Sequence, residues 1–422
     1  MSSNAVIEPY QIAVPEEAIE KWKKRLELTT FPQETSFSND WKYGVPLDDI
    51  KRLVGAWRET YDWRRAEAEL NEKLPQFTAR IGVEGHEDDL KVHFVHKKST
   101  KPGAIPLLFC HGCGFTLHRF FDSNDQLTTG KGPGSFIEVS KILPLLITSD
   151  KDDEPAFHVV APSLLNFGFS QGTSKPGFGI SQHAEAYHKL MLQLGYTKYV
   201  SQGGDWGFMI CRALGKQYPA HVIGSHLNLI ITRPPSLLSS PLLCLQYALG
   251  WYTAHEKAGF ERTKQFRAEG DGYSRIQGTK PHTPGFALTD SPVGLLAWIY
   301  EKLVGWSDAY EWTDQEILTW ISIYAFSEAG ANASVRLYYE AMHNETIDSI
   351  LGWNGKVPLG LSYFPKELVV LPSSWSKTLG PVVYEKRHDA GGHFAAFERP
   401  DDLVGDIKAF AKKAKLGQKL DL

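Results

Sequence analysis

Asp205 is the residue with the clearest chemical potential in this sequence, because it stands at the centre of a Gly-Gly-Asp-Trp-Gly run, residues 203–207. The run follows a short apolar segment typical of a strand and precedes an apolar segment typical of a helix. A nucleophile on such a tight turn needs small neighbours, because its backbone is strained and lies close to adjacent elements. The pentapeptide alone leaves open a second interpretation, in which Asp205 only caps the helix that follows.

A carboxylate at this position narrows the chemistry. It is a poor nucleophile for acyl transfer, but it can displace a group at saturated carbon and form an alkyl ester that water later hydrolyses. We therefore expect the opening of an epoxide or the cleavage of a carbon–halogen bond. An esterase would need Ser or Cys in place of Asp205.

Two later residues could complete a catalytic triad. Glu367 lies in a Phe-Pro-Lys-Glu-Leu run after a predicted strand at residues 358–363, and His393 lies in a Gly-Gly-His-Phe run after a predicted strand at residues 382–386. A carboxylate can hold the tautomer of an imidazole and stabilise its charged form. Each residue alone would more often be structural, but nucleophile, acid and histidine follow one another in the chain order that the α/β-hydrolase fold requires.

The loop after the predicted strand at residues 105–110 begins with His111 and a glycine. In this fold that loop supplies one backbone N–H of an oxyanion hole, here that of Cys113, and the residue after the nucleophile, Trp206, supplies the other. We expect Trp206, His111 and Phe394 to contact the substrate.

Strands that alternate with helical segments predict the fold that positions these residues. The pattern indicates an α/β-hydrolase fold with a mostly parallel sheet and helices on both faces. The carboxyl ends of the strands then meet at one edge, where the ligand is expected to bind. The predicted strands are residues 77–81, 90–96, 105–110, 157–161, 199–201, 222–229, 358–363 and 382–386, and two of the helices are residues 182–194 and 208–217.

The chain divides into four parts by pattern. Residues 1–100 form a helical extension that leads into the first strands, with amphipathic helices expected at 18–28 and 47–63. Residues 101–231 and 347–422 form the two parts of the core. Residues 232–346 lose the strand rhythm and are rich in Trp and Tyr, which is typical of a helical lid. Within the lid, the apolar residues 237–251 are interpreted as a buried or pocket-lining helix and not as a membrane-surface patch.

Composition excludes several classes of function. A net charge of −4 gives no sign of a nucleic-acid partner. The four cysteines lack zinc-site spacing and are too few for a disulfide scaffold, so a reducing compartment fits best. The expected chemistry needs no metal and no organic cofactor. We see no signal peptide and no membrane span, and expect a soluble, cytoplasmic protein.

Several runs in the first hundred residues are long and specific, such as Tyr-Gly-Val-Pro-Leu at 43–47, Tyr-Asp-Trp-Arg at 61–64 and Glu-Ala-Glu-Leu-Asn at 67–71. They resemble the N-terminal domain of the microsomal-type epoxide hydrolases. The resemblance covers nearly the whole chain, including the nucleophile, acid and base motifs. It implies that nucleophile, acid and base are Asp205, Glu367 and His393, and that the reactants are a small-molecule epoxide and water.

That family also uses two tyrosines of the lid to donate hydrogen bonds to the epoxide oxygen. The resemblance matches them to Tyr273 and Tyr338, with Tyr339 as the rival of the second. A haloalkane dehalogenase would instead need halide donors, usually Trp or Asn. Peripheral contact with a membrane such as the endoplasmic reticulum and a homodimer both stay open, as does the physiological epoxide.

One departure from the family bears directly on activity. The family continues His-Gly-Trp-Pro-Gly-Ser-Phe, whereas here residues 113–132 stand where the single Trp is expected. We hypothesise a retained intron, because a TGT codon for Cys113 and a GGG codon for Gly132 would rejoin as the TGG of Trp, in frame. The alternative is a genuine insertion that disturbs the oxyanion hole and leaves a catalytically impaired binding protein of the same fold. A smaller departure is Leu165-Asn166, where the family usually has Pro-Gly.

Overall fold

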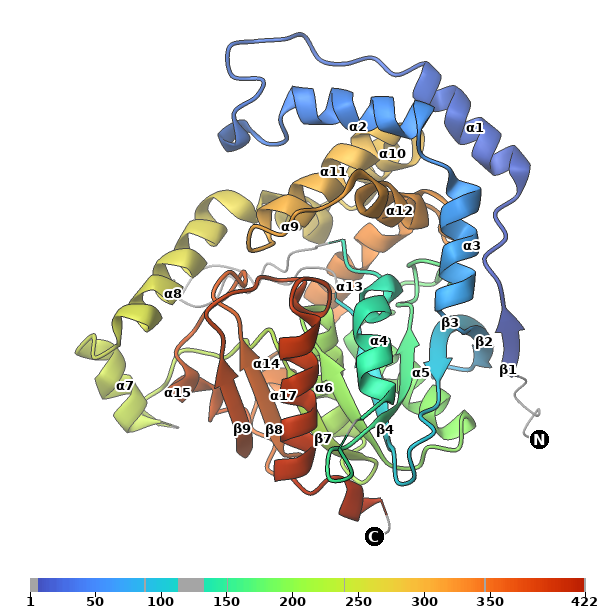
Figure 1. Ribbon diagram of the computed structural model, residues 1–422. Coiled ribbons are helices and arrows are strands. Elements are labelled where there is room, and N and C mark those ends of the chain that lie inside the picture. Colours follow the sequence, from blue (N-terminus) through green and yellow to red (C-terminus); the bar gives the residue numbers. More distant parts are fainter. Residues whose placement is uncertain are drawn as a thin grey trace.

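The computed structural model describes residues 7–86, 89–112, 133–149, 151–238, 240–344 and 347–420. These residues build one nine-stranded sheet in the order β1-β2-β3-β5-β4-β6-β7-β8-β9 (Figure 1). The first three pairs in this order are antiparallel and the remaining pairs are parallel. The strands are β1 (Ile7–Tyr10), β2 (Gln76–Ile81), β3 (Leu90–Lys97), β4 (Ile105–Cys110), β5 (Phe157–Pro162), β6 (Tyr199–Gly203), β7 (Val222–Leu227), β8 (Leu359–Tyr363) and β9 (Val382–Arg387).

The central parallel strands bring the chemically interesting loops together. Every residue of β4, β6 and β7 is buried, as expected for strands that are covered on both faces. β4 and β6 pair in a register that sets Cys110 opposite Gly203, so both strands end at the same level. The loop that begins at His111 and the loop that carries Asp205 therefore start side by side.

Helices cover both faces of the sheet, as Figure 1 shows. On one face α4 (Val139–Ile147) packs against β5, and α17 (Pro400–Lys413) packs against β7, β8 and β9. On the other face α6 (Trp206–Gln217) packs against β4, β6 and β7, and α5 (Ile180–Gln193) lies beside α6.

A group of helices between β7 and β8 lies over the carboxyl ends of the strands (Figure 1). The N-terminal helices pack on the outside of this group, where the Trp22 ring lies 5.9 Å from that of Trp57 and 6.1 Å from that of Phe326. The N-terminal helices are α1 (Glu16–Glu27), α2 (Leu47–Glu59) and α3 (Trp63–Lys73). The inserted helices are α7 (Pro241–Ala248), α8 (Ala254–Gln265), α9 (Gly272–Thr279), α10 (His282–Asp290), α11 (Pro292–Gly305), α12 (Asp314–Ala325), α13 (Arg336–Asn344) and α14 (Ile347–Leu351), while α15 (Ser373–Ser376) and α16 (Ala395–Glu398) follow β8 and β9.

Two sequence predictions about helices are wrong. The helix expected over residues 47–63 ends at Glu59, because the Asp62 carboxylate accepts a hydrogen bond from the Arg64 N–H and so caps a separate helix, α3. The apolar residues 237–251 are not buried. Leu238 is 100% exposed and Leu242 is 80% exposed, since α7 projects from the body of the protein.

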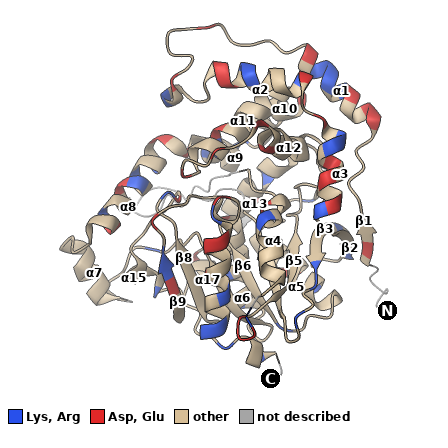
Figure 2. Ribbon diagram, viewed as in Figure 1, with Lys and Arg blue, Asp and Glu red and all other residues tan. Residues whose placement is uncertain are grey.

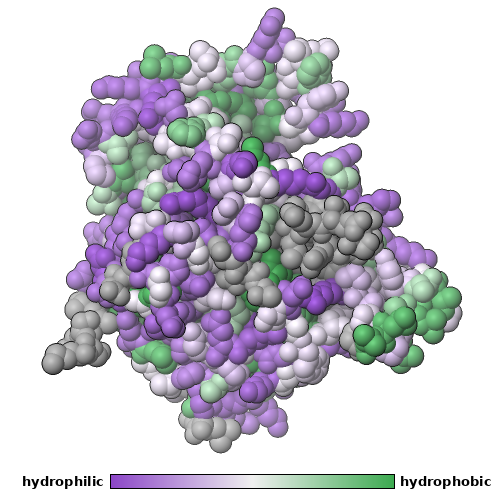
Figure 3. All heavy atoms as spheres, turned by 180° about the vertical axis from the view of Figure 1, so that it is seen from behind, coloured by the Kyte–Doolittle hydropathy of each residue, from purple (hydrophilic) through white to green (hydrophobic). Residues whose placement is uncertain are grey.

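Figure 3 shows the side chains of α7 as an apolar cluster at the edge of the molecule. α7 carries no charged residue, whereas the adjoining α8 carries charges of both signs (Figure 2). Among the helices that the structure describes, none is both long enough and apolar enough to cross a membrane.

Candidate active site

Asp205 occupies a strained turn between β6 and α6. Its φ of 60° and ψ of −130° lie in a region that side chains rarely adopt. Close packing explains the flanking glycines. A Cβ at Gly207 would lie 2.0 Å from the carbonyl oxygen of Cys110, and a Cβ at Gly203 would lie 2.5 Å from the carbonyl carbon of Gly207. The run therefore has the backbone geometry of a nucleophile elbow, as predicted, and Asp205 is also the N-cap residue of α6.

His393 lies between the two predicted carboxylates. Its Nε2 is 2.7 Å from Oδ2 of Asp205, and its Nδ1 is 2.6 Å from Oε1 of Glu367. All three side chains are buried. The Leu368 N–H donates to the same Glu367 oxygen at 2.7 Å, which fixes the carboxylate. Burial alone would lower the pKa of His393, but Glu367 and Asp205 on either side of the ring hold it well above its usual value.

The loop that carries His393 is attached to the helical insert by hydrogen bonds that no sequence motif predicted. The His393 N–H donates to the carbonyl oxygen of Trp306 at 2.9 Å, and the Gly391 N–H donates to Oδ2 of Asp308 at 2.8 Å. The Trp306 ring also packs edge-on against the imidazole, with ring centres 5.0 Å apart. Trp306 and Asp308 thus set the position of His393 from a distant part of the sequence.

Tyr273 and Tyr338 lie on α9 and α13, which pack against each other. The Tyr338 ring is completely buried and meets the Trp206 ring at 5.2 Å, whereas Tyr339 is 38% exposed. The Tyr273 ring lies 5.5 Å from the Trp306 ring, which in turn contacts His393. Tyr338 therefore contacts the residue that follows Asp205, and Tyr273 contacts a ring that packs on His393. This arrangement favours Tyr338 over Tyr339 as the second predicted tyrosine.

The structure describes only part of the loop that is predicted to contribute to the oxyanion hole. The Trp206 N–H donates to Oδ1 of Asp205. The Leu164 N–H donates to Nε2 of His111 at 3.2 Å, and burial lowers the pKa of His111 to about 4, so that ring is neutral. Cys113 and the rest of the segment 113–132 lie outside the described residues. His111 thus holds the neighbouring loop, in addition to the substrate contact predicted for it.

The glycines on either side of that segment lie against each other. A Cβ at Gly134 would lie 1.2 Å from the carbonyl oxygen of Gly112. The insert holds this part of the chain from above, because the indole N–H of Trp320 donates to the carbonyl of Pro133 and the Tyr324 hydroxyl donates to that of Gly134 at 2.5 Å. The chain therefore returns after residues 113–132 to the place that it left.

Comparisons with known proteins agree with this geometry. Residues 7–120 match the family described as "Epoxide hydrolase N terminus", and residues 105–243 match the family described as "alpha/beta hydrolase fold". Epoxide hydrolase 1 of Sus scrofa is 34% identical over 96% of this chain and 88% of its own length. Juvenile hormone epoxide hydrolase 1 of Ctenocephalides felis is 31% identical over 99% of this chain and 89% of its own length.

This chain belongs to the epoxide hydrolase family. The solved structures point the same way. Aspergillus niger epoxide hydrolase superimposes with a TM-score of 0.81 at 32% identity, covering 98% of both chains. The juvenile hormone epoxide hydrolase of Bombyx mori superimposes with a TM-score of 0.84 at 27% identity, covering 98% of this chain and 96% of that one. The predicted α/β-hydrolase fold is confirmed.

The smaller departure from the epoxide hydrolase family pattern has a structural explanation. Asn166 has a φ of 72°, a conformation that glycine adopts freely and that asparagine tolerates better than most residues. Its Oδ1 accepts a hydrogen bond from the Thr173 N–H at 2.9 Å. Asparagine therefore holds here a backbone conformation that glycine would adopt without strain.

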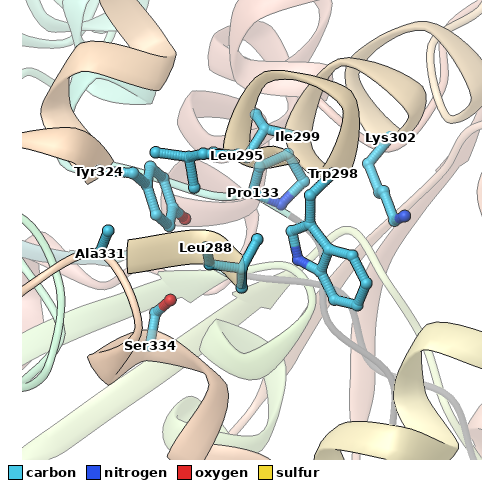
Figure 4. A pocket seen from close by; sticks show the side chains of 9 residues that line it. All are labelled: Pro133, Leu288, Leu295, Trp298, Ile299, Lys302, Tyr324, Ala331 and Ser334. Atoms are coloured by element: carbon cyan, nitrogen blue, oxygen red, sulfur yellow. The ribbon is translucent and has the colours of Figure 1, made fainter. Parts of the chain in front are cut away.

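This epoxide hydrolase has one cavity beside Asp205 and another within the helical insert. One measures about 20 Å³ and is lined by Asp205 and His393 together with Glu138, Gln202 and Asn228; His111 and Phe394 also line it. The other lies within the helical insert and is mostly apolar, as Figure 4 shows, with Leu288, Leu295, Trp298 and Ile299 around it.

Sequence reasoning missed Glu138 and Gln202, although Ser135 and Glu138 have the spacing of a capping box. The described residues contain no group of three His, Cys, Asp or Glu side chains placed to hold a metal ion.

Proposed function

We propose that this member of the epoxide hydrolase family converts epoxides to vicinal diols through an ester on Asp205, with His393 as the base and Glu367 as the acid of the triad. The observation that carries the proposal is the placement of one imidazole within 2.7 Å of a carboxylate on a nucleophile elbow and within 2.6 Å of a second carboxylate. An elbow that presents a carboxylate selects displacement at saturated carbon.

In the first step Asp205 attacks an epoxide carbon while Tyr273 and Tyr338 donate hydrogen bonds to the ring oxygen. The raised pKa of His393 places an imidazolium beside Asp205 in the free enzyme, and this cation keeps the nucleophile ionised. The bond from carbon to the ring oxygen breaks as the bond to the Asp205 oxygen forms. The oxygen leaves as an alkoxide, which takes up a proton.

The second step follows from the loss of charge on Asp205. Once Asp205 is an ester, only Glu367 still stabilises the imidazolium, so the pKa of His393 falls and it gives up a proton that balances the one taken by the alkoxide. Neutral His393 then removes a proton from water, which attacks the carboxyl carbon of Asp205. The backbone N–H groups of Trp206 and Cys113 are the proposed oxyanion hole. The bond between the carboxyl carbon and the substrate oxygen then breaks, the leaving oxygen takes the hydroxyl proton of the new Asp205 carboxyl group, and the diol leaves with Asp205 again ionised and His393 again protonated.

The test is mass spectrometry of the Asp205 peptide after brief incubation with styrene oxide. In His393→Gln the first step should proceed and the second should stop, so an adduct of the epoxide should persist on Asp205, whereas the unaltered protein releases diol. His388→Gln is the matched control, because His388 also pairs with a buried carboxylate, that of Asp406 at 2.6 Å, but belongs to another network. It should release diol and trap nothing.

Absence of both adduct and diol in the unaltered protein would overturn the proposal in favour of an impaired binding protein. The haloalkane dehalogenase and esterase alternatives are not favoured, since the relatives carry the name epoxide hydrolase. The division at residues 100, 231 and 346, with the middle insert as a lid, is part of the proposal. A cytoplasmic location, contact with the endoplasmic reticulum and a homodimer also belong to the proposal. Sedimentation of the protein alone would test the homodimer, and sedimentation with lipid vesicles would test the membrane contact.

A further inference from the structure

We propose that Glu138 and Gln202 hold the water molecule that hydrolyses the ester on Asp205, as water-positioning residues in the cavity that they share with the nucleophile and the base. The inference rests on the proposed function and adds two residues to it. Neither belongs to a triad, an oxyanion hole or a pair of lid tyrosines.

The size of the cavity sets its occupant. A water molecule needs about 10–15 Å³ of accessible space and two to four polar partners. The cavity of about 20 Å³ meets the first condition and is too small for a substrate. Its lining by Asp205, His393, Glu138 and Gln202 meets the second. A water placed here is next to both the carboxyl group of Asp205, which it would attack, and the imidazole of His393, which would take its proton.

Glu138 is a buried carboxyl group that can form further hydrogen bonds. It lies one residue before α4, and its Oε1 accepts the Ser135 N–H at 2.9 Å, which is the only hydrogen bond of this side chain among the described residues. Burial raises the pKa of Glu138 to about 8, with the charge of Asp205 acting in the same direction. The group is therefore mostly protonated at neutral pH and can donate an O–H.

Gln202 contributes the opposite polarity. It is the residue before the glycines of the elbow, and its side-chain N–H donates to Oδ1 of Asn228 at 2.9 Å. Its Oε1 is buried and accepts no hydrogen bond from any residue in the described part of the chain. An unsatisfied buried acceptor costs stability, and a water that donates to it removes the cost.

The four groups complement the hydrogen-bonding pattern of one water. The water donates one hydrogen to Gln202 and the other to neutral His393, and it accepts the proton of Glu138 with one lone pair. The second lone pair stays free to attack the carboxyl carbon of Asp205. These contacts matter only for the second step, because ring opening involves no water.

The experiment separates the two chemical steps. In Gln202→Met and Glu138→Met, rapid-quench measurements with styrene oxide should find ester formation within about threefold of the unaltered protein and ester hydrolysis about tenfold slower for the lost hydrogen bond. The ester then accumulates. Once slowed hydrolysis limits turnover in these variants, kcat and KM should fall together and kcat/KM should stay nearly constant.

Two further variants distinguish this role from a structural one. Glu138→Gln keeps an acceptor for Ser135 and a donor for the water, so its hydrolysis rate should recover to within about threefold. Glu256→Met removes the Glu of another capping box, on α8, where its Oε2 accepts the Thr253 N–H at 3.0 Å. That variant should change neither step.

Each result has one meaning. If turnover slows without ester accumulation, so that kcat and kcat/KM fall together, or if both Met variants hydrolyse the ester at the normal rate, the assignment is overturned. If one variant fails to fold, as judged by its melting temperature, the other still decides. An unaltered protein that forms neither ester nor diol overturns the proposed function itself and this inference with it.

Discussion

Gly207→Ala tests whether contact between α6 and β4 positions Asp205, the proposed nucleophile. Gly207 is the second residue of α6, two residues after Asp205, and it lies against the carbonyl of Cys110 at the end of β4. The change adds one methyl group and no charge, so any effect comes from space alone.

The size of the effect follows from the contact. The new carbon would lie 2.0 Å from the Cys110 oxygen, whereas contacts of this kind are essentially never below 3.0 Å. The helix and the strand must therefore part by about 1 Å at the elbow. Overpacking of a buried site costs about 1–3 kcal/mol, and a misplacement of about 1 Å can cost about 100-fold in rate. We expect a loss of about 3 kcal/mol in unfolding free energy and about 100-fold in kcat/KM.

Urea denaturation followed by tryptophan fluorescence and hydrolysis of styrene oxide measure the two quantities. The control is Gly405→Ala in α17, where an added Cβ meets nothing within 4 Å. There the higher helix propensity of alanine should raise the unfolding free energy by about 0.5–1 kcal/mol and leave activity unchanged. A Gly207→Ala protein with normal stability and normal kcat/KM would refute the argument.

Other changes should have equally distinct outcomes. Tyr338→Phe should lower the rate of ester formation by at least about tenfold through loss of one donor, whereas Tyr339→Phe should not; equal effects in rapid-quench assays would contradict the assignment. Among the imidazoles whose pKa burial lowers, four are almost completely inaccessible, and their pKa falls to about 3 for His93 and to about 4 for His111, His183 and His226. Between these pKa values and about 6.5 the unfolded chain binds more protons than the folded protein. The contribution of the four neutral imidazoles to the unfolding free energy should therefore be complete above about pH 6.5 and decrease as the pH falls towards 4. Urea titrations at several pH values would detect or disprove this decrease. Replacing residues 113–132 by a single Trp should preserve the melting temperature or raise it and should not lower the yield of diol, and an unfolded product would count against the retained-intron hypothesis.

The meeting of the three proposed triad residues could be predicted because each of them carries a local signature at the end of a strand. Parallel strands present their carboxyl ends at one edge, so Asp205 after β6, Glu367 after β8 and His393 after β9 had to meet there once the fold was inferred. The strands follow one another in the sheet in a different order from that in the sequence. The meeting of the carboxyl ends at one edge does not depend on that order, because it requires only that the strands are parallel.

Residues that act only through tertiary contacts have no local signature in the sequence and could not be predicted. Trp306 holds the backbone of His393 from the helical insert, and nothing in the spacing of the two residues indicates it. Glu138 had a local signature, the capping box, but that signature explains its contact with Ser135 and not the cavity on its other side. Burial was equally hidden for residues 237–251, because an apolar run does not reveal whether anything covers it.

The two ends of the segment 113–132 lie close enough together in the structure for a single residue to join them. With Trp in its place, Gly112 and Gly134 would be three residues apart, a separation that a chain can span over at most about 10 Å. The two glycines already lie closer than this, since a Cβ at Gly134 would fall 1.2 Å from the Gly112 carbonyl oxygen. The helical insert also holds Pro133 and Gly134 through hydrogen bonds from Trp320 and Tyr324. The fold therefore needs no residue of the segment to connect β4 to α4, and a short link would close the same turn.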